Sequence, residues 1–484
     1  MKKITLLLLA VLSISHAGLA QSNVSFGSPY SSVDASYNHY FYSGNELLSI
    51  KAQRQKLVLQ KLNSTTLNEI SSKTFNDLPK NYKIEYTVET DGKFYLLYSL
   101  ANKNNFQLFA REIDFAQGTF ASEAKQIIST EGSLKKKSSV GLRTSYDQSK
   151  LLIFYSLSTT DKNTTTTGMH VFNSSLETLW KNQVKSSSTE QRIDFAVDAA
   201  GTAYYLTEKN SSITLTTASA TGEASSQAVS LDKKTIRKIG LFETSPEDIL
   251  CAGFYNKDMN TSAAGGLFIL KSKSLNEAIT CPISQQVMQQ YTSDQQQSST
   301  QFMLKEVILE KDGSLTLIGE SQRRETIHYY TPKGHARNSY FLHYDDILVT
   351  KIDASGNLSW MKKLPKRQTG KAAEGQGVMS YRYMASENNY YLIFLDNENN
   401  KSVSLDDAPV NYINGEAGTL TAYEISKDKG SVTKLSILNT KDDQQLKVSD
   451  FSTHRIVPID AASFVLEFSK KGKEDVLMKT VFTQ

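Results

Sequence analysis

The chain has 484 residues, with 54 Lys and Arg against 50 Asp and Glu, so its formal net charge is only +4. A charge balance this small, spread along the chain, lacks the basic patch of a nucleic-acid-binding protein and excludes nucleic acid as a partner. With 8 Pro, 25 Gly and abundant Ser, Thr, Asn and Tyr, the composition suits antiparallel β-structure rather than disorder.

The first 20 residues have the pattern of an export signal. Lysines occupy positions 2 and 3, residues 4–14 are apolar, and Gly18-Leu-Ala20 offers a small-x-small cleavage site, which together predict a secretory signal peptide over residues 1–20. This apolar run is too short to span a bilayer, and no later run approaches 18 residues, so we expect a chain that does not span the membrane. Residues 21–484 are then the mature protein, exported to the periplasm or the cell exterior.

Residues 21–484 repeat one pattern about eight times, at a spacing of about 45 to 75 residues, as radial or stacked arrays do. Each copy has a strand, a short turn, an apolar second strand, a third strand of alternating polarity and an outer fourth strand. The second strand Leu151-Leu-Ile-Phe-Tyr155 is apolar on both faces, as a strand packed between two sheets must be. The only helix expected is a short one near residues 283–291.

The copies are located by their turns and their two central strands. The first turns lie at residues 43–45, 91–92, 147–149, 200–201, 245–248, 312–313, 386–389 and 460–462. The second strands are expected at residues 47–50, 94–100, 151–157, 203–207, 249–255, 314–319, 390–395 and 463–468. The third strands are expected at residues 57–62, 106–113, 169–172, 212–217, 266–271, 347–353, 419–425 and 475–481.

The last copy ends after its third strand, at Gln484. Residues 24–33 precede the first copy and are free to supply the missing fourth strand, which would protect an exposed sheet edge. We therefore predict an all-β fold, a single closed β-propeller of eight four-stranded blades whose ring is closed by an N-terminal strand. Seven blades are the near alternative, and two β-sandwiches in tandem are disfavoured because no linker divides the chain.

One copy carries a family resemblance. Residues 351–360 read Lys-Ile-Asp-Ala-Ser-Gly-Asn-Leu-Ser-Trp, and in this they resemble secreted bacterial β-propeller repeat proteins with the motif Lys-Ile-Asp-x-x-Gly-Asn-x-x-Trp. Elsewhere the motif is degraded, as at residues 171–180. The resemblance implies a fold in which the second-to-third and fourth-to-next-first connections share one face. It names no ligand, and no functional residue carries over from it.

Insertions interrupt the repeat, and by this geometry all of them belong to the same face. They lie at residues 158–168, 256–265, 284–301, 321–346, 365–377 and 396–418. Four of the longest belong to blades five to seven. Loops held on a rigid scaffold are where binding usually occurs, so this face is the predicted functional face.

The insertion at residues 321–346 is the richest in side chains that bind ligands. Aromatic rings combined with Arg and His donors suit the recognition of a sugar, a peptide or a partner protein. The candidate binding residues are Arg323, Arg324, His328, Tyr329, Tyr330, His335, Arg337, Tyr340, His343 and Tyr344. The alternative is a long hairpin extension whose polar residues are merely solvated.

Neither a metal nor a cofactor is expected. The three histidines of the insertion are spaced by seven and eight residues, which matches no zinc pattern. Residues 396–407 have oxygen side chains at calcium-loop spacing, but Lys401 stands where that loop requires Gly. Cys251 and Cys281 are expected on strands separated by a third, about 9.6 Å apart and beyond the roughly 7 Å reach of a disulfide, so two free thiols are expected.

No catalytic motif is present: there is no His-Glu-x-x-His, no Gly-x-Ser-x-Gly and no phosphate-binding Gly-rich loop. The sequence thus favours an exported non-catalytic binding or scaffolding propeller that recognises a partner protein or glycan through the loops of blades five to seven. The alternative is an exported hydrolase or lyase acting on polysaccharide or a lactone, since paired carboxylates need meet only in space. A structural role in an envelope assembly is a third possibility, and the sequence leaves the oligomeric state open.

Overall fold

The computed structural model describes residues 22–53, 56–101, 105–132, 134, 140–158, 161, 163–222, 224–256, 264–291, 301–330, 334–371, 379–416, 418–439, 446–447, 452–470 and 473–482. The expected signal peptide, residues 1–20, lies outside these described residues. Within them strands predominate, and no helix is long and apolar enough to cross a membrane.

The described strands form eight sheets, numbered here in chain order and antiparallel except for the pair β28–β31. Sheets 1 and 2 contain β3 (Tyr37–Ser43), β4 (Glu46–Gln53), β5 (Lys56–Asn63) and β6 (Glu69–Phe75), then β7 (Lys83–Thr90), β8 (Lys93–Ala101), β9 (Asn105–Asp114), β10 (Thr119–Phe120) and β11 (Lys125–Glu131). Sheets 3 and 4 contain β12 (Gly141–Thr144), β13 (Lys150–Leu157), β14 (Thr164–Asn173) and β15 (Thr178–Ser187), then β16 (Gln191–Val197), β17 (Ala203–Lys209), β18 (Ser212–Ala218) and β19 (Ala224–Val229).

Sheets 5 to 8 follow the same pattern with additions. Sheet 5 contains β20 (Ile236–Glu243), β21 (Ile249–Asn256), β22 (Ala264–Lys271) and β23 (Ser274–Pro282), and sheet 6 contains β24 (Phe302–Leu309), β25 (Leu315–Tyr330), β26 (Ala336–Ile352), β27 (Leu358–Leu364), β28 (Gln368–Lys371) and β31 (Tyr412–Ile413). Sheet 7 contains β29 (Arg382–Ala385), β30 (Asn389–Asp396), β32 (Thr419–Ser426) and β33 (Val432–Asn439), and sheet 8 contains β34 (Leu446–Lys447), β35 (Ile456–Pro458), β36 (Ser463–Lys470) and β37 (Glu474–Phe482) with the N-terminal β1 (Ser22–Phe26) and β2 (Tyr30–Ser31). The helices are α1 (Gln285–Gln289), η1 (Glu398–Ser402) and η3 (Thr453–Arg455).

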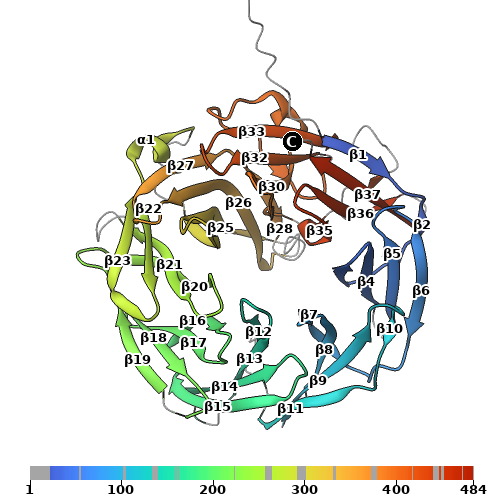
Figure 1. Ribbon diagram of the computed structural model, residues 1–484, viewed down its shortest axis with the longest axis horizontal. Coiled ribbons are helices and arrows are strands. Elements are labelled where there is room, and N and C mark those ends of the chain that lie inside the picture. The colour runs from blue at the N-terminus through green and yellow to red at the C-terminus, as the bar shows by residue number, and fades with distance from the viewer. Residues whose placement is uncertain are drawn as a thin grey trace, which may run out of the picture.

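The sheets stand side by side around a central axis (Figure 1). First strands such as β7, β12 and β20 lie nearest the axis, and last strands such as β6, β15 and β19 lie at the rim. Every second and third strand expected from the sequence lies in a pair of central strands, from β4 and β5 in sheet 1 to β36 and β37 in sheet 8. The short helix expected near residues 283–291 is α1. The all-β prediction is therefore confirmed.

The two ends of the chain meet in sheet 8. β1 pairs antiparallel with β37, from Ser22 opposite Phe482 to Phe26 opposite Met478, and β2 pairs with β37 further along. An N-terminal segment thus lies on the outside of the C-terminal strand, as residues 24–33 were expected to do.

The core is divided into eight apolar clusters of described residues, one between each two consecutive sheets. For example, Leu152 of β13 packs with Phe195 of β16, and Leu317 of β25 packs with Leu250 of β21. The eighth cluster joins sheet 8 to sheet 1 and contains Leu47 of β4. Each sheet is therefore covered on both faces, which is why its central strands are apolar on both sides.

A buried charge cluster lies at the contact between sheets 1 and 8. The ammonium group of Lys51 on β4 is 2.8 Å from Glu467 of β36 and 2.9 Å from Asp475 of β37, and all three side chains are 3% exposed or less. The phenol groups of Tyr30 and Tyr40 donate to the two Glu467 oxygens at 2.7 and 2.5 Å. Burial alone would lower the pKa of Lys51 and raise that of Glu467, but their mutual attraction outweighs it and shifts both the other way.

The two cysteines are free thiols within the protein interior. Cys251 lies on β21 and Cys281 on β23, with β22 paired between them. The separation by one strand that was expected from the repeat is therefore present. Burial raises the pKa of Cys251 to about 12, so this thiol is unreactive while the protein is folded.

We predict that Lys51→Met lowers the free energy of unfolding by about 3–5 kcal/mol, because it leaves the Glu467 and Asp475 carboxylates buried without their cation. Denaturant unfolding followed by fluorescence measures the change. Lys83→Met is the control, since Lys83 forms an ion pair with Glu85 but its side chain is 61% exposed, and such a pair contributes about 0–1 kcal/mol.

The same cluster has a pH dependence. Because the pKa of Glu467 is lowered in the folded state, its stabilising effect is present above the ordinary carboxyl pKa and disappears as the pH falls through the lowered value. Equal unfolding midpoints for Lys51→Met and the parent chain at pH 7 would contradict this role.

Candidate binding site

The insertion at residues 321–346 is a continuation of two strands of sheet 6. β24 accompanies β25 only as far as Ser321, and β27 accompanies β26 only as far as Ile347, whereas β25 and β26 pair from Gln322 opposite Tyr344 to Tyr330 opposite Ala336. We call this projecting hairpin, residues 322–330 and 334–344, the arm. The insertion is therefore a long hairpin extension in shape.

Two other insertions join the arm. β28, from the insertion at 365–377, pairs with β26 between Phe341 and Tyr344. β31, from the insertion at 396–418, pairs parallel with β28. The insertion at 284–301 contacts the same group, since Gln290 donates to Asp406 at 2.8 Å. The insertions at 321–346, 365–377 and 396–418 thus form one small sheet on one side of the molecule.

The ten candidate residues do not form a single surface. Side chains directly opposite each other in a hairpin share a face, and successive residues alternate between faces. Arg323, Tyr329, Arg337 and His343 lie on one face, whereas Arg324, His328, Tyr330, Tyr340 and Tyr344 lie on the other, with His335 just before β26. The binding role of the ten residues stays a prediction, and a partner that contacted all of them would have to reach both faces of the hairpin.

His343 is an internal organiser of the arm. Its Nδ1 lies 3.0 Å from Arg323 Nη2 and 3.0 Å from Thr369 Oγ1, and its Nε2 lies 2.8 Å from Glu325. These partners require Nδ1 to accept and Nε2–H to donate, the neutral tautomer. Burial first, and then the Arg323 guanidinium, lower the pKa of His343. The residue is only 7% exposed, so it holds β26 to β25 and β28 rather than contacting a ligand.

The exposed rings of the arm are the side chains available to a partner. Tyr330 is 77% exposed, and Ile327, Tyr329 and Tyr340 are each more than a third exposed. The Arg324 guanidinium stacks 4.0 Å from the Tyr340 ring centre, which fixes both groups. Rigid aromatic side chains of this kind dominate the energetics of protein interfaces.

A buried ion pair, which no pattern in the sequence predicts, fixes the base of the arm. Lys366 lies 2.9 Å from Glu320 with both side chains fully buried, and it donates to the Tyr344 carbonyl at 2.7 Å. Ser380, which precedes β29 of the next sheet, donates to Glu320 at 2.7 Å. Nothing in the local pattern distinguishes Lys366 or Glu320 from surface charges.

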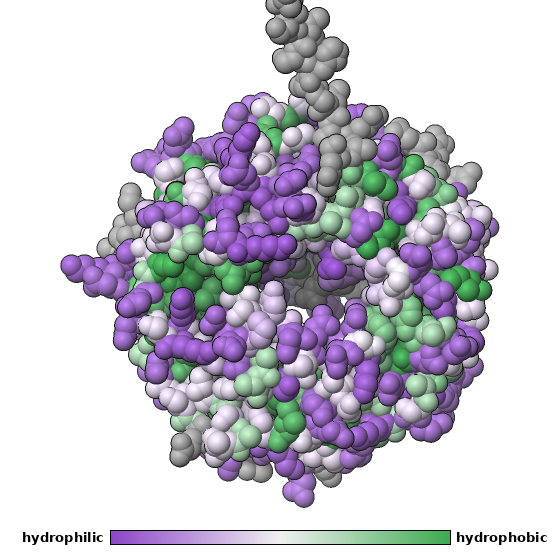
Figure 2. All heavy atoms as spheres, in the orientation of Figure 1, coloured by the Kyte–Doolittle hydropathy of each residue, from purple (hydrophilic) through white to green (hydrophobic). Residues whose placement is uncertain are grey.

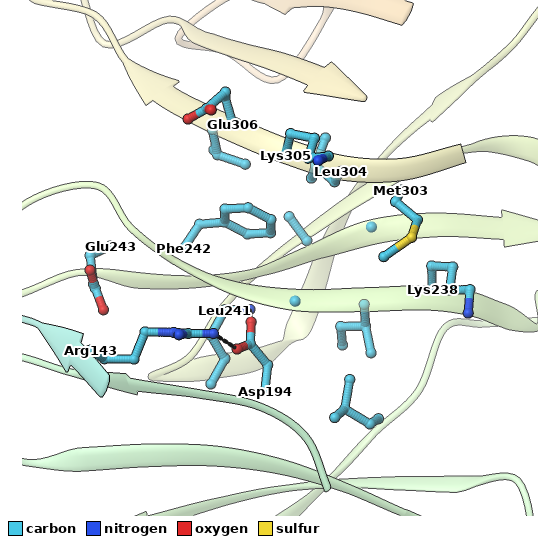
Figure 3. A pocket seen from close by; sticks show the side chains of 16 residues that line it. Arg143, Asp194, Lys238, Leu241, Phe242, Glu243, Met303, Leu304, Lys305 and Glu306 are labelled. Atoms are coloured by element: carbon cyan, nitrogen blue, oxygen red, sulfur yellow. Dashed lines mark hydrogen bonds and ion pairs between the residues drawn. The ribbon is translucent and has the colours of Figure 1, made fainter. Parts of the chain in front are cut away.

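A second candidate site lies at the innermost strands, which sequence reasoning did not resolve into residues. A pocket of about 660 Å³ opens among β12, β16, β20 and β24, with Lys238, Glu243 and Lys305 in its walls (Figure 3). Burial raises the pKa of Glu243 to about 7. Figure 2 shows a hollow at the centre of the molecule with hydrophilic residues around its mouth. Among the described residues, no group of three or more His, Cys, Asp or Glu could hold a metal ion.

Comparison with known proteins yields no family. No protein-family model and no curated protein match the chain. Among solved structures, the WD40 domain of SCAP from fission yeast is 9% identical, with a TM-score of 0.39 over 96% of this chain and 99% of that chain. The polysaccharide lyase Uly1 is 10% identical, with a TM-score of 0.40 over 94% and 92%, and an uncharacterized protein from Listeria monocytogenes is 8% identical, with a TM-score of 0.39 over 74% and 83%. At these scores the likenesses assign no ligand or activity to this chain.

We predict that two substitutions in the arm shift the pKa of His343 in opposite directions. Arg323→Gln removes a neighbouring cation and raises it, whereas Glu325→Gln removes a carboxylate acceptor and lowers it further. NMR titration of histidine-labelled protein measures both shifts, with His343→Gln used for assignment.

His170 on β14 is the internal control for this titration. Its pKa is lowered to about 4 by burial and then by Lys181, and neither substitution should alter it. Shifts of the same sign at His343 in the two variants would show that Arg323 and Glu325 do not act on the imidazole as described.

Proposed function

We propose that this chain is an exported, non-catalytic binding propeller that recognises a partner protein through the arm and the strands β28 and β31 beside it. The observation that carries the proposal is the convergence of three insertions, from two neighbouring sheets, into one small sheet. Among the insertions, these three are the ones whose described residues pair with one another as strands, and elaborations on a rigid scaffold are usually for binding.

The finer description of the fold belongs to the same proposal. We infer that the eight sheets are eight blades of one closed ring, which is closed by β1 on β37. Two features support the closing of the ring between sheets 8 and 1. They are the apolar cluster at this contact and the ion pairs of Lys51 across it. Residues 1–20 are proposed as the signal peptide that directs the chain to the periplasm or the cell exterior, in the manner of secreted bacterial propeller repeat proteins.

A protein partner is favoured over a glycan at the arm because of its free edge. Beyond Ser321, β25 pairs on one side only among the described residues. An extended segment of a partner can add to such an edge by main-chain hydrogen bonds. The edge ends in Thr326-Ile-His-Tyr-Tyr330, a run rich in β-branched and aromatic residues that favour strand pairing. The exposed rings of Tyr329 and Tyr330 would then select the side chains of the partner.

The test is capture from envelope extract followed by direct binding of the purified partner. We predict that Tyr329→Ser combined with Tyr330→Ser raises the dissociation constant for the partner at least 30-fold. This is the effect of losing about 2 kcal/mol of binding free energy at a hot spot. Tyr146→Ser is the matched control, because Tyr146 is 56% exposed in a turn of sheet 3. Replacing residues 325–341 by Asn-Gly, which leaves Arg324 opposite Leu342 to close the hairpin, should abolish binding.

The outcomes separate clearly. A protein retained by the parent chain and by Tyr146→Ser, but lost from both folded arm variants, supports the proposal. A partner retained equally by all four chains would place the binding surface elsewhere.

The second candidate function, an exported hydrolase or lyase acting on polysaccharide or a lactone, has one observation in its favour. The Glu243 carboxyl has a pKa of about 7 within a pocket, where it can donate or accept a proton near neutrality. Release of soluble product from a polysaccharide panel, abolished by Glu243→Gln, would establish this function. Product release that persists in that variant would remove Glu243 from consideration.

A further inference from the structure

The innermost strands present basic residues to solvent and keep acidic residues half-buried. On the described first strands of sheets 2 to 7, the exposed charged side chains are all basic: Lys83, Arg143, Arg237, Lys238, Lys305 and Arg382. The acidic side chains of the same strands are all half-buried: Glu85, Glu89, Asp194, Glu243 and Glu306. A chain with little net charge has thus placed an excess of cations at its centre.

A repeated backbone irregularity contributes to this arrangement in sheets 5 and 6. In sheets 2, 4, 5 and 6, the pairing of the first strand with the second shifts by one residue, so that Glu85, Ile193, Arg237 and Lys305 are the extra residues. Such bulges redirect side chains and occur often beside binding sites. In sheet 5 the bulge leaves two consecutive residues, Arg237 and Lys238, both exposed.

A glycine accommodates the sheet 5 bulge. A Cβ at Gly253 of β21 would lie 1.9 Å from the Lys238 carbonyl oxygen. The close approach of the two backbones therefore excludes any side chain at this position. The close packing of β20 against β21 thus fixes the backbone position of Lys238.

The pocket is lined by three basic and three acidic side chains, and only some of them are paired with one another. Arg143 and Asp194 are 2.8 Å apart, and the second Asp194 oxygen accepts from the Leu241 amide, so this pair is satisfied. Lys238 has no ion-pair or hydrogen-bond partner among the described residues. Lys305 is 3.6 Å from Glu320, but that carboxylate already has the closer, fully buried Lys366. Lys238 therefore has no ion pair among the described residues, and Lys305 has only a long one, to a carboxylate that it shares with Lys366.

The carboxyl groups near these lysines suit hydroxyl-bearing ligands. Glu243 and Glu306 line the pocket, and burial raises the pKa of each, to about 7 for Glu243. At a pKa of about 7 the Glu243 carboxyl can both donate and accept hydrogen bonds near neutrality, as recognition of sugar hydroxyls requires, and Glu306 adds two acceptor oxygens. Figure 3 places Lys238 and Met303 on one side of the pocket and Glu243 and Arg143 on the other. A volume of about 660 Å³ lies in the range of small-molecule sites, about 300–1,000 Å³.

We propose that this central pocket binds a short acidic oligosaccharide, with its carboxylate or sulfate groups against Lys238 and Lys305 and its hydroxyls against Glu243 and Glu306. An acidic peptide is disfavoured for two reasons. Its closely spaced carboxylates would lie beside the carboxyl groups of Glu243 and Glu306, and it lacks the hydroxyl groups that could hydrogen-bond to them. The site is separate from the exposed rings of the arm, and binding there requires no turnover.

The test is calorimetric titration of the full mature chain with four probes. These are trigalacturonate, a chondroitin sulfate tetrasaccharide, maltotriose and triglutamate. We expect the uronate, the sulfated sugar or both to bind, with an affinity that falls as salt rises, and the two acidic sugars distinguish carboxylate from sulfate recognition. Maltotriose and triglutamate should not bind.

Variants locate the site. Lys238→Gln and Lys305→Gln should each weaken binding about tenfold, the effect of losing one hydrogen bond to a charged group. Both lysines are exposed, so the unfolding midpoint should stay constant. Lys125→Gln, at an exposed position of β11, is the matched control.

Several results would overturn the proposal. These are equal binding of maltotriose, binding of triglutamate alone, no binding of any acidic sugar, or acidic-sugar binding that survives in the Lys238→Gln and Lys305→Gln double variant. None of them bears on the arm, whose exposed tyrosines lie outside the pocket. Loss of partner capture in the tyrosine variants with unchanged sugar binding would separate the two sites.

Discussion

The ion pairs of Lys51 with Glu467 and Asp475 are the constraint on which the assembly of the sheets depends. They join the first sheet to the last, where the apolar cluster has six buried residues, fewer than in any other contact between neighbouring sheets of the described chain. Apolar surfaces tolerate sliding, but a buried lysine displaced from its carboxylates would leave several charges unpaired. The cluster therefore favours one alignment of the sheet 1 and sheet 8 faces over others.

The same device recurs at the base of the arm. Lys366 and Glu320 are fully buried and paired at 2.9 Å, and Ser380, which precedes β29 of the neighbouring sheet, completes the contact. In both places a buried lysine joins elements that strand pairing does not connect: sheet 1 with sheet 8 through Lys51, and the segment after β27 with β25 through Lys366. The exposed tyrosines of the arm are presented by a base that cannot shift without exposing or separating a buried charge pair.

Much of the fold could be predicted because its signals are local. The doubly apolar run at Leu151 and the turn before Trp360 each specify strands within one copy. The faces of the arm were missed because its insertion was taken as one patch, although the alternation of a hairpin separates Tyr329 from Tyr330. Strands as short as β28 and β31 carry too few residues for any periodicity. The pocket was missed because Arg143, Lys238 and Lys305 come from three different sheets, and the bulges beside Lys238 and at Lys305 are set by pairing between strands.

The two candidate sites meet at a single carboxylate. Glu320 lies 2.9 Å from Lys366 at the base of the arm and 3.6 Å from Lys305 at the pocket. Lys366 is fully buried, whereas a third of the Lys305 side chain is exposed. An anion in the pocket would therefore contact Lys305 and leave the closer Lys366–Glu320 ion pair in place. Glu320 would also keep its hydrogen bonds from Ser380 and Gln322, both at 2.7 Å. The carboxylate at the base of the arm thus keeps its partners whether or not the pocket is filled, so the proposed partner and the proposed anion would not compete for it.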